Sequence, residues 1–334
     1  MIPSRRGFFE VHGVIDDAFV LYSVITIGAM LGLTPLFIVA LGKSGSVGPP
    51  LVKELWTRYF SWLILAPLMI GPVLLGAPYA IMAVGVLSLL CYREYARATG
   101  LFRERLMSSM AVLGIVGVAL SSLDNWYGLF TSLAPLIVGL IAAVAILADR
   151  PSGYIQRVGL SVLGFMLFGM CLAHFGFLGN HLRFRPMMIW LLFCVQMNDV
   201  FAYICGKSFG RRKLAPHTSP NKTIGGAAGA LALTTILAAG LARIVFYDTV
   251  LAEWRHVIFM GITISLMGQI GDLLLSSVKR DVGIKDMGAA FPGHGGVLDR
   301  FNSLLLVSPA IFHYLKYYLD EGWNEQVRVF SGSL

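Results

Sequence analysis

A polar segment in the C-terminal half of the chain brings acidic, basic and glycine residues close together. It runs from Gln269 to Ser303 and reads QIGDLLLSSVKRDVGIKDMGAAFPGHGGVLDRFNS. Its first part continues an apolar run, and a helix would place Asp272, Ser276 and Lys279 on one face because they recur every three or four residues. An aspartate so near the end of an apolar helix is costly to bury unless it faces a cavity or a cation. Asp272 is therefore a candidate functional residue.

The second part of this segment combines a flexible turn with further charges. The turn PGHGG, residues 292–296, offers backbone amides that can approach a phosphate closely, and Asp299 follows it. Carboxylates can hold Mg²⁺ and basic groups can neutralise phosphate oxygens, so this mixture is typical of phosphoryl or nucleotidyl transfer. The basic side chains of the segment are Lys279, Arg280, Lys285 and Arg300.

A second polar segment begins at Asn198 and ends at Gly226. Asp199, Tyr203 and Gly206 would share one face of an apolar helix, and a basic loop containing Ser219 and Pro220 follows. A basic, hydroxyl-bearing loop next to a membrane suits a substrate that has a phosphate headgroup and lipid tails. The basic residues of this loop are Lys207, Arg211, Arg212, Lys213 and Lys222.

The elements that position these residues must be membrane helices. Of 334 residues, 57% are hydrophobic and only 13% are charged, whereas a soluble domain carries about 25% charged residues. This composition is a poor fit for a disordered chain, a disulfide scaffold or a soluble enzyme. We therefore expect an all-α fold, a polytopic integral membrane bundle of nine or ten transmembrane helices. The ten candidate spans are 18–41, 57–75, 78–92, 108–121, 127–147, 158–177, 186–206, 224–244, 257–276 and 302–319.

The basic residues indicate how such a bundle is oriented. With ten spans, 17 of the 26 Lys and Arg residues fall in the loops after spans one, three, five, seven and nine, and eight fall on the other side. The remaining one, Arg58, begins the second span on the same side as the 17. The positive-inside rule places the richer side in the cytoplasm. Both polar loops, 207–223 and 277–301, lie on that side. We expect a protein of the bacterial inner (cell) membrane whose active site faces the cytoplasm.

The chain is expected to form one polytopic domain over residues 1–334. Residues 1–185 would supply N-terminal helices of unspecific pattern, and residues 186–319 would form the half that carries the motifs. No cleaved signal peptide is expected, because the first apolar run is too long for one. Two groups of residues are assigned no function: the cysteines, expected to be buried free thiols, and the charges of a solvated interfacial loop. These are Cys91, Cys171, Cys194 and Cys205, and Arg93, Glu94, Arg97, Arg103 and Arg105.

The motifs resemble the signature of a known family, the phosphatidate cytidylyltransferases or CDP-diacylglycerol synthases. The resemblance rests on SSVKRDVGIKDMGAAFPGHGGVLDR at 276–300, with DVFAY at 199–203, FG at 209–210 and SPNKT at 219–223. It implies an enzyme that joins CTP and phosphatidic acid into CDP-diacylglycerol and pyrophosphate. It also implies a Mg²⁺-dependent two-metal centre in which a second cation such as K⁺ can take part. The metal-binding carboxylates would be Asp272 and Asp299, and Asp286 would be a further acid of the site.

The remaining site residues are assigned from this resemblance together with residue chemistry. We expect His294 to donate a hydrogen bond to phosphate or to structure the loop rather than act as a base, because a phosphate monoester is already ionised at neutral pH. The basic residues would neutralise the phosphates, and the glycine-rich turn would bring amides close. The candidate catalytic residues are Lys279, Arg280, Asp286, His294 and Arg300. The candidate substrate-binding residues are Asp199, Ser219, Pro220, Lys222, Ser276, Gly293, Gly295 and Gly296.

Two departures from the family pattern keep alternatives open. The family usually has an acid where this chain has Asn302, and Glu-Gly where this chain has Gly225-Gly226. The acceptor lipid could therefore differ, as in a CDP-archaeol synthase or a polyprenol kinase. A cation-coupled transporter and a lipid-binding protein without turnover are further alternatives. Expected partners are CTP, phosphatidic acid and membrane lipids but no nucleic acid, because no aromatic-interleaved basic platform is present. Small-residue helix faces are compatible with a homodimer.

Overall fold

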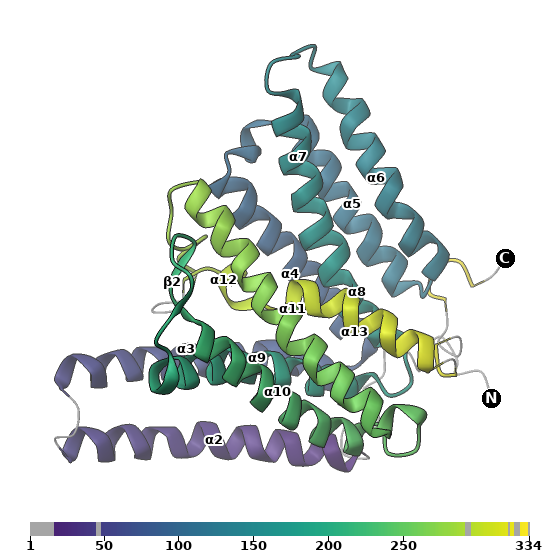
Figure 1. Ribbon diagram of the computed structural model, residues 1–334. Helices are drawn as coiled ribbons and strands as arrows, with labels where there is room; N and C mark the ends of the chain where they lie inside the picture. The colour runs from purple at the N-terminus through teal and green to yellow at the C-terminus, as the bar shows by residue number, and fades with distance from the viewer. Residues whose placement is uncertain (1–16, 45–47, 291–294, 320, 324–327, 333–334) are drawn as a thin grey trace.

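The protein is almost entirely helical in the computed structural model, which describes all residues except 1–16, 45–47, 291–294, 320, 324–327 and 333–334 (Figure 1). Short helices of other geometry connect or interrupt the α-helices. The α-helices are α2 (Ala18–Lys43), α3 (Pro49–Leu75), α4 (Ala77–Ala98), α5 (Arg105–Leu123), α6 (Tyr127–Leu147), α7 (Tyr154–Gly164), α8 (Leu172–Phe177), α9 (Phe184–Phe209), α10 (Ile224–Val245), α11 (Trp254–Asp281), α12 (Val297–Phe301) and α13 (Leu304–Tyr318). The connecting helices are η1 (Leu101–Arg103), the π-helix η2 (Phe165–Cys171), η3 (Leu178–Asn180) and η4 (Val250–Ala252).

Eight helical stretches of the described residues are long and apolar enough to cross a membrane. They are α2, α3, α5, α6, the continuous stretch Tyr154–Asn180, α9, α10 and α11. The expected all-α polytopic membrane class is confirmed, and eight of the ten candidate spans coincide with these eight stretches. The predicted spans 78–92 and 302–319 do form helices. However, charged residues lower the hydropathy of α4 near its C-terminal end, and α13 has only 15 residues.

Local sequence explains where the site-bearing helices begin. Thr223 caps α10, because its hydroxyl oxygen accepts a hydrogen bond from the amide of Gly226 at 3.1 Å. Just before this cap, β1 (Lys213–Ala215) and β2 (Ser219–Thr223) pair as an antiparallel hairpin. The basic loop predicted between the seventh and eighth spans is therefore an ordered hairpin that ends on a helix.

The small residues at the start of α10 serve close helix packing. A Cβ atom on Gly226 would lie 2.6 Å from the carbonyl oxygen of Ala202, and one on Gly229 would lie 2.4 Å from Cβ of Cys205. Both partners belong to α9. Glycine at these positions therefore lets α10 lie directly against α9, which holds the hairpin beside the C-terminal end of α9 (Figure 1).

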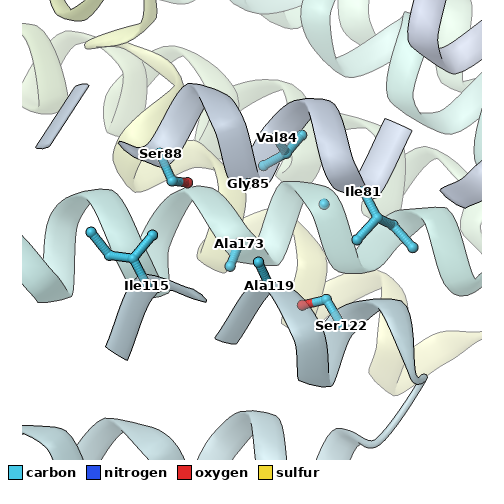
Figure 2. A pocket seen from close by; sticks show the side chains of 10 residues that line it. Ile81, Val84, Gly85, Ser88, Ile115, Ala119, Ser122 and Ala173 are labelled. Carbon is cyan, nitrogen blue, oxygen red and sulfur yellow. The ribbon is translucent and has the colours of Figure 1, made fainter. Parts of the chain in front are cut away.

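A second close contact joins α4 to α5, η2 and α8. Figure 2 shows Ile81, Val84, Ser88 and Ile115 around a small void at this junction. Its volume is about 10 Å³, which is room for at most one water molecule. A Cβ on Gly176 would lie 3.3 Å from Val84. This region is thus packed core rather than a substrate site.

All four cysteines are free thiols, as predicted, and only Cys171 is less than fully buried.

The arrangement brings the two predicted polar segments to the same region of the molecule. The hairpin follows α9, the segment 282–290 follows α11, and both lie at the left of the view in Figure 1. Helices α9, α10 and α11 pack against one another, and α12 packs on α4. The site is therefore assembled from helix ends and the loops that follow them.

Candidate active site

Asp272 lies on α11 and pairs with a lysine from the hairpin. Its Oδ2 is 2.5 Å from Nζ of Lys222 on β2, and both side chains are 23% exposed. Its Oδ1 accepts a hydrogen bond from the amide Nδ2 of Asn302 at 2.5 Å. The structure therefore brings together two predicted residues, Asp272 and Lys222, that are 50 positions apart in the sequence.

Asp299 lies on the short helix α12 and is almost completely covered. Its side chain is 5% exposed, and its Oδ1 is 2.8 Å from Nζ of Lys279 on α11. Its Oδ2 accepts hydrogen bonds from the backbone amides of Met287 at 2.9 Å and Gly296 at 3.0 Å. This single carboxylate therefore joins the end of α11, the loop after it and the start of α12.

Glycine is required where this loop passes the Asp299 carboxylate. Gly295 has φ +77°, a left-handed conformation that favours glycine. A Cβ atom on Gly295 would also lie 2.9 Å from Oδ2 of Asp299. The two described glycines of the predicted turn thus shape the loop around Asp299. Gly293 and His294, which were predicted to contact phosphate, lie outside the described residues.

Asp199 on α9 is connected to Asp272 through two neutral side chains. The hydroxyl of Ser303 donates to the Asp199 carboxylate, with both oxygens at 3.2 Å. The backbone amide of Ser303 donates to Oδ1 of Asn302 at 2.7 Å, and Asn302 in turn donates to Asp272. Asn302, which replaces the usual family acid, thus bridges the carboxylates of α9 and α11.

Glu94 on α4 is a site residue that the sequence analysis missed. Its Oε1 accepts from the amide of Val297 at 3.0 Å and its Oε2 from the amide of Leu298 at 2.8 Å. The carboxylate therefore caps the first turn of α12, next to Asp299. The prediction that Glu94 belongs to a solvated interfacial loop was wrong. No local motif signals this role, because the partners are about 200 residues away.

Replacing Glu94 with alanine is expected to destabilise the loop between α11 and α12. Two backbone amides would lose a charged acceptor, which costs about 1–3 kcal/mol in total. We expect a lower unfolding temperature in detergent and faster tryptic cleavage after Lys285. The matched control is Glu104→Ala, because Glu104 makes no capping hydrogen bond at the start of α5. Equal behaviour of the two variants would contradict the capping role.

Asn198, the neighbour of Asp199, is a second residue without a predicted role. Its side chain is completely buried, and Oδ1 accepts from Thr234 at 3.1 Å and from Ser265 at 2.6 Å. Its Nδ2 has no hydrogen-bond partner among the described residues. Asn198 therefore joins α9, α10 and α11 at the position in the sequence that precedes Asp199.

The other predicted basic residues occupy different environments. The exposed Arg280 donates to the carbonyl oxygens of Thr218 at 3.2 Å and Ile284 at 3.0 Å, so it ties the hairpin to the loop after α11. Arg300 is partly buried beside Asp299. Burial lowers the pKa of its guanidinium, while the Asp299 carboxylate opposes this shift. An arginine titrates so far above neutrality that the group stays charged. Phosphate binding by these two residues stays a prediction.

The remaining predicted residues surround this core. Ser219 and Pro220 lie on β2, shortly before Lys222 on the same strand. Ser276 is buried on α11, between Asp272 and Lys279 in the sequence. Asp286 is exposed, and its Oδ1 is 3.4 Å from the position of a Cβ on Gly295. The roles of these residues toward a substrate stay predictions.

A large apolar cavity opens onto the same residues. Its volume is about 700 Å³, and its walls come mainly from α2, α3 and α9. Asp199, Asp299 and Arg300 also line it. The charged core of the site is thus continuous with a space suited to hydrocarbon.

The donor atoms of the site suit a hard cation such as Mg²⁺. They are carboxylate, amide and hydroxyl oxygens. Among the described residues, however, no group of three or more His, Cys, Asp or Glu side chains is close enough to hold a metal ion. Each predicted metal ligand also forms an ion pair with a lysine. A bound cation would therefore have to displace Lys222 from Asp272 and Lys279 from Asp299. Metal binding stays a prediction.

Comparison with known proteins places these features in a family. The family model described as "Cytidylyltransferase family" matches residues 56–318. The chain is 34% identical to the "Uncharacterized protein YnbB" of Escherichia coli (strain K12), over 58% of this chain and 65% of that protein. It is 31% identical to a phosphatidate cytidylyltransferase of Bacillus subtilis (strain 168), over 63% of this chain and 80% of that protein. It is also 31% identical to a phosphatidate cytidylyltransferase of Staphylococcus aureus (strain COL), over 74% of this chain and 94% of that protein. The chain therefore belongs to the cytidylyltransferase family.

Proposed function

We propose that this protein is a CTP:phosphatidate cytidylyltransferase, which converts phosphatidic acid and CTP into CDP-diacylglycerol and pyrophosphate. The observation that carries the proposal is the Lys279–Asp299 contact at the wall of an apolar cavity, together with the Lys222–Asp272 contact, which hydrogen bonds connect to Asp199 on the same wall. The charged groups suit the phosphates of a nucleotide, and the apolar cavity suits the hydrocarbon chain of a lipid. The relatives named phosphatidate cytidylyltransferase support the same activity.

The reaction is an in-line displacement at phosphorus. A phosphate oxygen of the lipid attacks the α-phosphorus of CTP, the bond to the α–β bridging oxygen breaks, and pyrophosphate leaves. No general base is needed, because the attacking phosphate is already ionised at neutral pH. The protein therefore contributes positioning and charge neutralisation. Lys222, Lys279 and Arg300 are the cationic groups available next to the carboxylates.

We further propose that the carboxylates hold Mg²⁺ when nucleotide is present, and that a second cation such as K⁺ can accompany it. Asp272 and Asp299 would be the ligands, with Asp199 connected to Asp272 through Ser303 and Asn302. When bound, Mg²⁺ would neutralise charge on the nucleotide phosphates. Lys222 and Lys279 would then be released from their carboxylates and could contact phosphate instead.

The orientation of the site follows from the charge distribution. The region from the end of α9 through the hairpin and the region from the end of α11 to α12 carry nine basic residues: Lys207, Arg211, Arg212, Lys213, Lys222, Lys279, Arg280, Lys285 and Arg300. The positive-inside rule supports a bacterial inner-membrane protein with these regions in the cytoplasm, where CTP is available. Small residues on exposed helix faces are compatible with a homodimer.

The test uses purified protein in detergent with Mg²⁺, phosphatidic acid and CTP labelled on either the α- or the γ-phosphate. We expect the α-label to enter the lipid phase, pyrophosphate to appear, and EDTA to stop both. Transfer of the γ-label with release of CDP would identify a lipid kinase instead. Failure of both labels with phosphatidic acid, archaeal ether lipid and polyprenol acceptors would overturn the proposal.

A further inference from the structure

The apolar cavity has a wall that lies outside the family match. The family model begins at residue 56, whereas α2 ends at Lys43 and still contributes seven lining residues, among them Thr34 and Ile38. Helix α2 is scarcely buried by the rest of the protein, since only Val20 and Ile38 are fully covered. Its contact with the protein is made mainly through α3 and α9. Helix α2 therefore encloses the cavity without forming part of the packed core.

The cavity is polar at one end and apolar along the rest of its length. Arg58, Asp199 and Arg300 mark the polar end, and Met69, Ile70 and Ile189 lie toward the other. Along α3, Ile70 is 12 positions beyond Arg58, which corresponds to roughly 18 Å of helix. The shape and polarity thus match an amphiphile with an anionic headgroup and a long hydrocarbon chain.

Arg58 can serve the polar end without breaking a strong contact. In the structure its Nη2 is 2.6 Å from Oε1 of Glu54, one helical turn earlier, and both side chains are about half exposed. Exposed pairs of this kind contribute little to stability, about 0.3–0.5 kcal/mol. A phosphate beside Arg58 and Arg300 would therefore displace Glu54 at small cost.

We propose that this cavity holds an acyl chain of the phospholipid substrate, and that α2 and α3 together select chain length. The inference rests on the proposed cytidylyl transfer and deepens it. The phosphate of the lipid lies at Arg58 and Arg300, next to Asp199 and Asp299, and the chain extends between α2, α3 and α9 toward Ile70. A residue that narrows the cavity partway along this path must discriminate against long chains.

The experiment narrows the cavity at Ala66. This buried residue lines the wall on α3, eight positions and about 12 Å beyond Arg58. For Ala66→Phe we expect the ratio of kcat/KM for dioleoyl over didecanoyl phosphatidic acid to fall about tenfold relative to the unmodified protein. Leu68→Phe is the matched control, because Leu68 is on the same helix, 57% exposed and outside the cavity lining.

A second pair of variants tests the α2 wall and guards against misfolding of the first. The variants are Thr34→Phe and its control Leu33→Phe. Thr34 lines the cavity on α2, whereas Leu33 is 63% exposed and outside the cavity lining. Thr34→Phe should lower the same ratio while Leu33→Phe leaves it unchanged. An unchanged ratio in both cavity variants would overturn the inference even if transfer itself occurs. Absence of transfer to either lipid by the unmodified protein would instead overturn the proposed function.

Discussion

Replacing Asp299 with asparagine is expected to lower cytidylyl transfer to phosphatidic acid by about a hundredfold or more. The carboxylate accepts three hydrogen bonds, from Lys279, Met287 and Gly296. An asparagine has one acceptor oxygen, and its NH₂ group would face donors that need an acceptor. Hydrogen bonds to charged groups contribute about 1.5–3 kcal/mol each, and 1.4 kcal/mol corresponds to a tenfold rate change. The loss of one or two of them accounts for the expected effect.

The control for this prediction is Asp281→Asn. Asp281 is the last residue of α11 and is exposed, only two positions beyond Lys279. The Asp281→Asn variant should retain the activity of the unmodified protein, measured as label incorporated into lipid from CTP labelled on the α-phosphate. If Asp299→Asn retains full activity, then Asp299 neither holds a cation nor organises the loop around the substrate.

The membrane fold could be predicted from the sequence because hydropathy is a local property. Every predicted span coincides with a helix of the structure. Helices α4 and α13 are the least typical of the predicted spans, because charged residues end the apolar run of α4 and α13 has only 15 residues. The charge that interrupts α4 has a structural reason, since Glu94 must reach the amides of α12. The charged residue that ends the apolar run of α4 is thus also part of the site.

The site was predicted as a set of residues but not as a set of contacts. Motif spacing selected Asp272, Asp299, Lys222 and Lys279, which the structure does bring together. It did not indicate which lysine pairs with which carboxylate, because the pairing depends on how the hairpin folds back onto α11. The bridging role of Asn302 depends on the same packing.

The residues that line the apolar cavity could not be predicted from the sequence, for a different reason. Its walls come from helices whose apolar residues look alike whether they face lipid or each other. The N-terminal half was described only as unspecific, although the family match begins at residue 56 and so includes most of it. Only the spacing between α2, α3 and α9 distinguishes a cavity-lining residue such as Thr34 from an exposed neighbour outside the cavity such as Leu33.

Replacing Lys222 with methionine is expected to lower transfer by about a hundredfold and also to destabilise the protein. Methionine keeps the length of the side chain but removes the ammonium group. The Asp272 carboxylate, only 23% exposed, then loses its cationic partner. Leaving a largely covered charge without its partner costs about 1–3 kcal/mol. In the transfer reaction the same change removes a cation that we propose contacts phosphate. The exposed Lys285→Met is the matched control for loss of a basic residue nearby.

The double variant Lys222→Met with Asp272→Asn would separate these two effects. It removes both charges of the pair, so the unfolding temperature should recover toward that of the unmodified protein if pairing with Asp272 is what stabilises it. Transfer should stay at the low level, because neither the cation nor the carboxylate is present. Recovery of transfer together with stability would show that the pair serves the fold alone. Lys222 would then have no role toward phosphate, and the charge neutralisation assigned to it would fall to Lys279 and Arg300.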